Sequence, residues 1–149
     1  MKNLIVLLYL LMAIGTFSCQ KDNEQKPEIR ETMTAQIEGK SFSATSFVLA
    51  RASQTTSING SAENVVNPES ISISIQHIQP GSFLLSEDPS SYAVYNSPTE
   101  EFLSSSGNVT ITKITDEWIE GTFDFTAHSI NNPSLQVHLS KGEFKLKFE

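Results

Sequence analysis

Cysteine is almost absent from this chain, in which Cys19 is the only cysteine among 149 residues. One cysteine cannot form a disulfide within the chain, so a folded domain here must be stabilised by packing and hydrogen bonds. Basic residues are also scarce, with ten lysines and arginines against 17 acids, and they do not cluster. Because nucleic-acid binding depends on clustered positive charge, we expect no nucleic-acid partner.

Long hydrophobic runs are missing as well. The longest run, Leu4 to Ile14, would reach about 16 Å as a helix, which is roughly half the hydrocarbon thickness of a bilayer. This run is therefore too short to remain as a membrane anchor. Lys2 precedes it and the small residue Ser18 follows, a pattern typical of a secretory signal segment. We expect residues 1–18 to be a signal peptide.

Cys19 lies where this segment ends. The sequence Thr16-Phe17-Ser18-Cys19 resembles the lipobox of bacterial lipoproteins, with Phe17 as the departure from the usual pattern. The resemblance implies that Cys19 becomes the first residue of the mature chain and carries acyl chains such as palmitate. Two acyl chains, at about 0.8 kcal/mol per buried methylene, anchor a protein durably, whereas one chain does so only marginally. The alternative is a secreted protein whose thiol is incidental.

A polar tract follows the cysteine. It consists of Gln20, Lys21, Asp22, Asn23 and Glu24. The tract is similar to the lipoprotein export signal of Bacteroidota-type envelopes, which implies handling by lipoprotein processing and export machinery and a place on the outer face of the outer membrane. Residues 19–30 contain almost no apolar side chain, so we expect a flexible tether. The mature chain would carry a net charge of −8 because Lys2 leaves with the signal.

Residues 31–149 have the length of one domain, and apolar residues recur in them with a period of two. The segments Ser70–Gln76 and Trp118–His128 show this alternation most clearly. We predict an all-β fold of about nine or ten antiparallel strands without an amphipathic helix. A β-sandwich and a closed β-barrel both satisfy one apolar face per strand.

We favour the sandwich because Ala50–Glu69 is typical of a long crossover, with turn signals at Asn59-Gly60 and Asn67-Pro68. Lys141-Gly142 is predicted as a hairpin turn between a strand that contains Leu135 and a strand that ends at Phe148. His77 continues the parity of the Ile71–Ile75 face, which predicts a hydrogen-bonded residue at the rim of the core.

Several segments together resemble a family of small Bacteroidota-type envelope lipoproteins that carry a domain of unknown function. The resemblance rests on Met33–Phe42, Pro80–Leu85, Gly107–Ile114, Ile119–Ala127 and Gly142–Phe148. The recurring residues in these segments are glycines at turns and apolar residues at alternating positions, both of which a sandwich requires. The resemblance implies a β-domain over roughly residues 32–148 and implies no activity.

Residues for chemistry are few. His77, His128 and His138 lack the spacing of metal ligands, so we expect no metal site and no cofactor. The acidic pairs Glu87-Asp88, Glu100-Glu101 and Asp116-Glu117 flank predicted turns, where they serve solubility. No serine lies in a nucleophile elbow, and we expect no catalytic residues.

Binding is the remaining hypothesis. Trp118, Tyr92 and Tyr95 are the candidate residues, because exposed aromatic rings stack on sugars or anchor protein interfaces. We expect a lipid-tethered, surface-displayed module that binds a glycan or protein or joins an envelope assembly. A glycan-binding accessory domain of a polysaccharide-uptake system would need two aromatic rings on one face. A hydrolase, the third alternative, would need a cleft near Asp124 and His138.

Overall fold

The computed structural model describes residues 30–62 and 67–148. These residues form ten strands and no helix. The strands are β1 (Thr32–Ile37), β2 (Lys40–Ser43), β3 (Ser46–Ala52), β4 (Thr55–Ser61), β5 (Ser70–Gln76), β6 (Gly81–Leu84), β7 (Ser91–Asn96), β8 (Glu101–Ile114), β9 (Trp118–Ser129) and β10 (Gln136–Lys147). All pairings are antiparallel. The predicted all-β antiparallel fold is confirmed.

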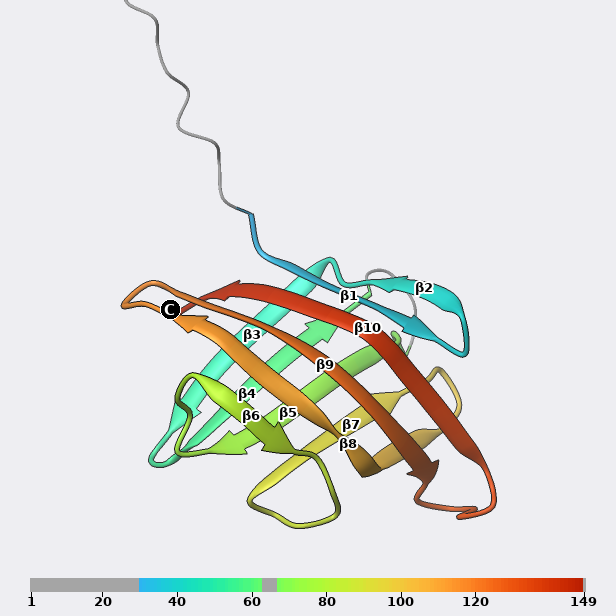
Figure 1. Ribbon diagram of the computed structural model, residues 1–149. Coiled ribbons are helices and arrows are strands. Elements are labelled where there is room, and N and C mark those ends of the chain that lie inside the picture. Colours follow the sequence, from blue (N-terminus) through green and yellow to red (C-terminus); the bar gives the residue numbers. More distant parts are fainter. Residues whose placement is uncertain (1–29, 63–66, 149) are drawn as a thin grey trace, which may run out of the picture.

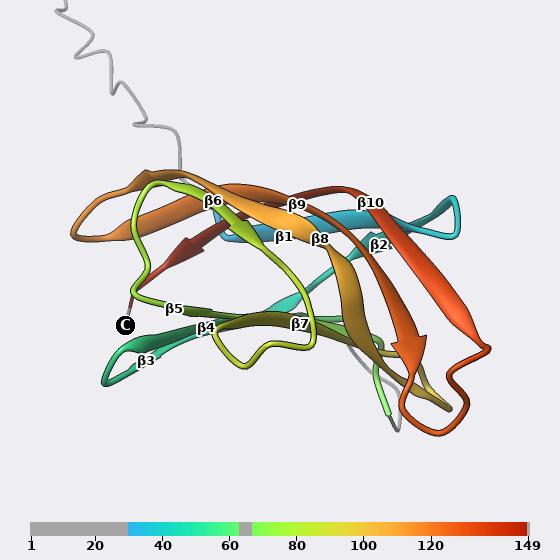
Figure 2. The ribbon, with the colours of Figure 1, turned by 60° about the horizontal axis from the view of Figure 1, so that its bottom comes forward.

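All ten strands belong to one curled sheet (Figure 1). Its hydrogen-bonded order is β2-β1-β10-β9-β8-β7-β5-β4-β3, and β6 also pairs with β8. Within the described residues the order ends at β2 and β3, so the sheet curls into a half-barrel without closing into a ring. Its two halves face each other as layers, with β1, β8, β9 and β10 in one and β3, β4, β5 and β7 in the other (Figure 2).

Strand β8 carries the sheet from one layer to the other. Its first residues, Glu101 to Leu103, pair with β7, whereas Asn108 to Ile111 pair with β6 along the same edge. Gly107 lies between these stretches with a φ of 135°, next to a register shift at Ser104–Ser106. A bulge and a residue with positive φ bend a strand sharply, and this bend separates the two layers.

The hydrophobic core lies between the layers. The fully buried side chains include Ile58, Ile71, Ile73 and Ile75 from one layer and Ile119, Phe125, Leu139 and Leu146 from the other. Every second residue of these strands is buried, apart from the bulge in β10, and this alternation predicted the strands over Ser70–Gln76 and Trp118–His128. Each layer therefore contributes one apolar face, and their contact is the main stabilising interaction of the domain.

The predicted crossover over Ala50–Glu69 is wrong. The segment holds the end of β3 and all of β4, which pair as a hairpin around Ser53-Gln54. Asn59-Gly60 lies inside β4, where a Cβ on residue 60 would come within 2.6 Å of the Met33 sulfur in the opposite layer. Residue 60 is thus a glycine because the layers approach closely there, and the turn signal was misleading.

Three further local predictions are also wrong. Lys141-Gly142 is a bulge inside the continuous strand β10, with Lys141 at a φ of 51°, and not a hairpin turn. Leu135 precedes β10 and is 46% exposed. His77 is exposed at a φ of 51° because it turns the chain away from β5. In each case a change of backbone conformation interrupts the alternation on which the prediction depended.

In the described residues the structure contains no helix long and apolar enough to cross a membrane.

Candidate functional site

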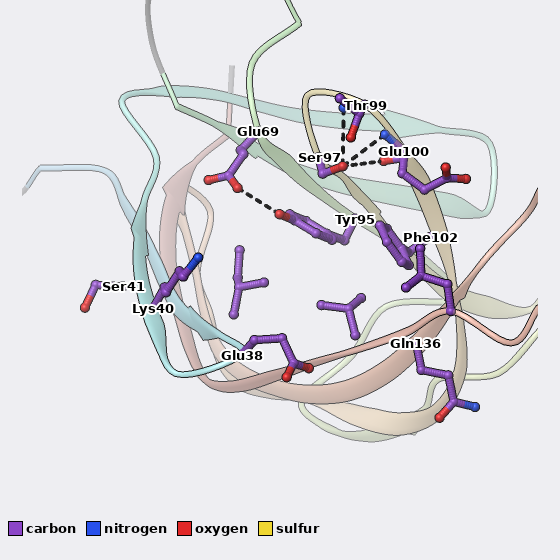
Figure 3. Close-up of a pocket in the computed structure, with 13 residues that line it drawn as sticks. Glu38, Lys40, Ser41, Glu69, Tyr95, Ser97, Thr99, Glu100, Phe102 and Gln136 are labelled. Atoms are coloured by element: carbon purple, nitrogen blue, oxygen red, sulfur yellow. Dashed lines mark hydrogen bonds between the residues drawn. The ribbon is translucent and has the colours of Figure 1, made fainter. Parts of the chain in front are cut away.

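A pocket of about 510 Å³ opens between the two layers at one end of the sheet (Figure 3). It is lined by the β1–β2 turn, the start of β5, the β7–β8 turn with the start of β8, and the start of β10. Its volume lies in the range of small-molecule sites. The turns of both layers therefore converge on one concave surface.

The pocket lies at the opposite end of β1 from the first described residues. Strand β1 begins at Thr32, beside Lys145 near the end of β10, and runs to Ile37, beside Leu139. Ile37 lines the pocket, whereas Glu31 accepts a hydrogen bond from the backbone N–H of Lys147. The segment that precedes residue 30 therefore joins the domain at the end away from the pocket.

Two aromatic rings form one wall. Tyr95 and Phe102 stack with ring centroids 5.7 Å apart, and the hydroxyl of Tyr95 donates a hydrogen bond of 2.8 Å to Oε1 of Glu69. Burial, followed by the hydrogen bond and the charge of Glu69, raises the pKa of Tyr95 well above its ordinary value. The phenol is therefore a fixed donor that orients the Glu69 carboxylate along this wall (Figure 3).

Three glutamates and one lysine, Lys40, line the pocket, and the side chain of Glu100 points away from it (Figure 3). Besides Glu69, these acids are Glu38, which accepts a 2.6 Å hydrogen bond from the backbone N–H of His138, and Glu100. Hydrogen bonds from Ser129 and then Asn131 hold the pKa of the Glu100 carboxyl below its ordinary value. The pocket thus presents net negative charge and many hydrogen-bond acceptors at neutral pH.

Aliphatic side chains complete the lining. Ile37 and Val137 are buried, but Leu135 is 46% exposed at the mouth. Burial of this exposed leucine by a bound partner would be favourable. The site combines an apolar surface with a few convergent polar groups, as ligand pockets do.

A second cavity, of about 530 Å³, lies at the other end of the sheet. It is lined by Leu49, Arg51 and Phe148, among others, and the guanidinium of Arg51 lies 4.7 Å from the centre of the Phe148 ring. Its cation is therefore already packed against an aromatic face. This arrangement stabilises the chain terminus, and the pocket at the far end is the better candidate site.

The structure separates the three aromatic candidates. Trp118 lies on the outer face of β9, half-buried, with the Lys145 ammonium 5.7 Å from its ring centre and paired with Glu120 at 2.8 Å. Tyr92 is half-buried on the outer face of β7. Tyr95 points inward and is 4% exposed, so its prediction as an exposed ring is wrong. Trp118 lies near the end of β8, whereas β7 pairs with its start, and Tyr92 and Tyr95 point to opposite faces of β7. No two of these three rings therefore lie side by side on one face.

The histidines also lie apart. His128 contacts Glu87 at 3.2 Å, and His138 lies 3.8 Å from Asp124, diagonally across β9 and β10. His138 and Asp124 are each more than half exposed on the outer face. In the part of the chain that the structure describes, no group of three or more histidine, cysteine or acidic residues is arranged to hold a metal ion.

Sequence reasoning missed most of the pocket. Its polar residues Glu38 and Glu69 come from separate turns, and neither belongs to a recognisable motif. Glu100 was assigned to solubility as part of an acidic pair. The predicted lipidation residue Cys19 and the predicted export tract Gln20–Glu24 lie outside the described residues.

Comparison with known families gives one match. A model for a domain of unknown function, DUF6252, matches residues 30–146. No curated protein and no solved structure matches the chain. The matched segment runs from the start of β1 into the last strand, so it covers both layers and the pocket between them. The chain belongs to the DUF6252 family.

Proposed function

We propose that the protein is an outer-membrane lipoprotein of a Bacteroidota-type envelope, displayed on the cell surface through acyl chains on Cys19, and that it acts without catalysis by binding a partner. The observation that carries the binding role is the pocket between the layers, at the end of β1 away from residue 30. A tether that joins the opposite end leaves this pocket directed away from the membrane. The acidic composition keeps the domain off anionic head groups.

The state of the pocket acids favours binding over catalysis. A general acid requires a raised pKa, but the Ser129 and Asn131 hydrogen bonds lower the pKa of Glu100. Tyr95 stays protonated and already donates to Glu69. The pair His138 and Asp124 is exposed on the outer face, away from the burial that tunes catalytic groups.

The glycan-binding alternative receives less support. Sugar rings stack on the open faces of aromatic side chains. Tyr95 and Phe102 stack on each other and are 4% and 7% exposed, so neither ring presents an open face to a sugar. Trp118 has Lys145 over its ring. The aliphatic mouth around Leu135 is better suited to an apolar surface on a partner.

Photo-cross-linking in intact cells tests this role. Benzoylphenylalanine in place of Leu135 is expected to form a covalent adduct with the pocket's partner, visible as a mass increase of the purified lipoprotein. The same residue in place of Lys113, exposed toward the other end of β8, is the control. No adduct at position 135, or adducts of equal yield at both positions, would contradict the proposed binding role.

A further inference from the structure

The pocket adjoins a free sheet edge. Strand β2 pairs only with β1 among the described residues, and it is one end of the strand order. Lys40 and Ser41, its first two residues, also line the pocket. An unpaired edge presents a row of backbone donors and acceptors that an extended segment of another protein can pair with.

The charge of the pocket determines which kind of side chain a bound segment would place in it. Two glutamates, Glu38 and Glu69, accompany the one lysine of the pocket lining, Lys40. The Glu69 carboxylate accepts the Tyr95 hydroxyl with one oxygen, so its second oxygen can accept a hydrogen bond from a ligand. The neighbouring surface is aliphatic, from Ile37 and Val137. A lysine or arginine side chain matches both features, because its stem is apolar and its head is cationic.

The surroundings of the mouth favour a protein over a small amine. Ile130 and Leu135, at the two ends of the β9–β10 loop, are 54% and 46% exposed. The backbone N–H of Ile130 donates to the carbonyl of Glu101, next to the pocket residue Glu100. Leu135 lines the pocket and Ile130 lies outside its lining, so a small amine would leave Ile130 uncovered whereas a protein could cover both residues.

We propose, on the basis of the binding role above, that the partner is a protein whose extended segment pairs with the free edge of β2 and places a basic side chain in the pocket beside Glu69. The backbone pairing supplies affinity independent of sequence. The carboxylates and aliphatic wall supply the preference for a basic residue.

A peptide titration followed by NMR tests this inference with the purified full-chain protein. The probe is the capped peptide Thr-Val-Lys-Val-Thr, compared with the same peptide carrying norleucine in place of lysine and with pentylamine alone. The lysine peptide is expected to shift the resonances of Lys40, Ser41 and Glu69, and to bind at least about tenfold tighter than either other probe. Glu69→Gln, which keeps an acceptor for Tyr95, is expected to abolish the preference for lysine over norleucine.

Glu117→Gln, an exposed acid at the other end of the sheet, is the matched control and should leave the preference intact. Equal binding of the lysine and norleucine peptides would overturn the cationic preference but leave the binding role standing. Pentylamine as tight as the peptide would overturn the protein partner in favour of a small amine. A lysine peptide that shifts no pocket resonance would overturn the inference as a whole, while the cross-link at position 135 decides the binding role separately.

Discussion

Gly107→Ala is expected to lower the free energy of unfolding by about 4 kcal/mol. The new Cβ would lie 2.3 Å from the backbone oxygen of Asp124 and 2.4 Å from Cα of Phe125, both on the neighbouring strand β9. Backbone atoms in a paired strand cannot move aside as a flexible side chain can. The φ of 135° adds strain for any residue with a Cβ.

Gly39→Ala separates these two causes. Gly39 also has a positive φ, 77°, but no atom lies within 4 Å of its added Cβ. The control should therefore cost only about 1 kcal/mol, from backbone strain. Urea denaturation of both variants measures the difference. Equal losses in the two variants would mean that β8 does not bend against β9 as described, and the separation of the layers would need another explanation.

Cys19→Ala is expected to move the protein almost completely from the membrane fraction to the soluble fraction. Two acyl chains account for the whole attachment in our proposal, because the mature tether is polar and the domain is acidic. Labelling with palmitate and fractionation of the cells measure both the lipid and the location. Replacement of Lys21 and Asp22 with alanine is the control, and should keep the label while the protein faces the periplasm. A Cys19→Ala protein that stays membrane-bound after a salt wash would refute the lipid anchor.

Strand alternation predicted the parts of the fold in which each residue either packs in the core or faces solvent. Ser70–Gln76 is β5 as predicted. The predicted segment from Trp118 to His128 matches β9, which ends one residue later at Ser129. The predictions failed where the residue type at a position is determined by contact with a residue that is distant in the sequence. Gly60 is small because Met33 approaches it from the other layer. Gly142 pairs with Phe123, whose ring lies where a Cβ of residue 142 would be, so this glycine allows close packing inside a strand and does not mark a turn.

The pocket could not be predicted from the sequence for a related reason. Glu38, Glu69 and Leu135 are far apart in the chain, and each lies in or beside a turn whose position depends on how the sheet curls. Tyr95 was proposed for binding as an exposed ring, but it contributes instead from a buried position, through the hydroxyl that orients Glu69. Alternation along one strand carries no information on which turns of the two layers meet.

Thiol labelling on intact cells tests the central claim, that the pocket is displayed outward and occupied by a partner. Leu135→Cys in the lipidated protein is treated with a membrane-impermeant maleimide, and Leu84→Cys, at a position that is 81% exposed, is the reference. We predict that residue 84 reacts equally fast on cells and in the purified protein, whereas residue 135 reacts several-fold more slowly on cells. Equal rates at residue 135 in both settings, or no reaction at residue 84 until the cells are lysed, would contradict the claim.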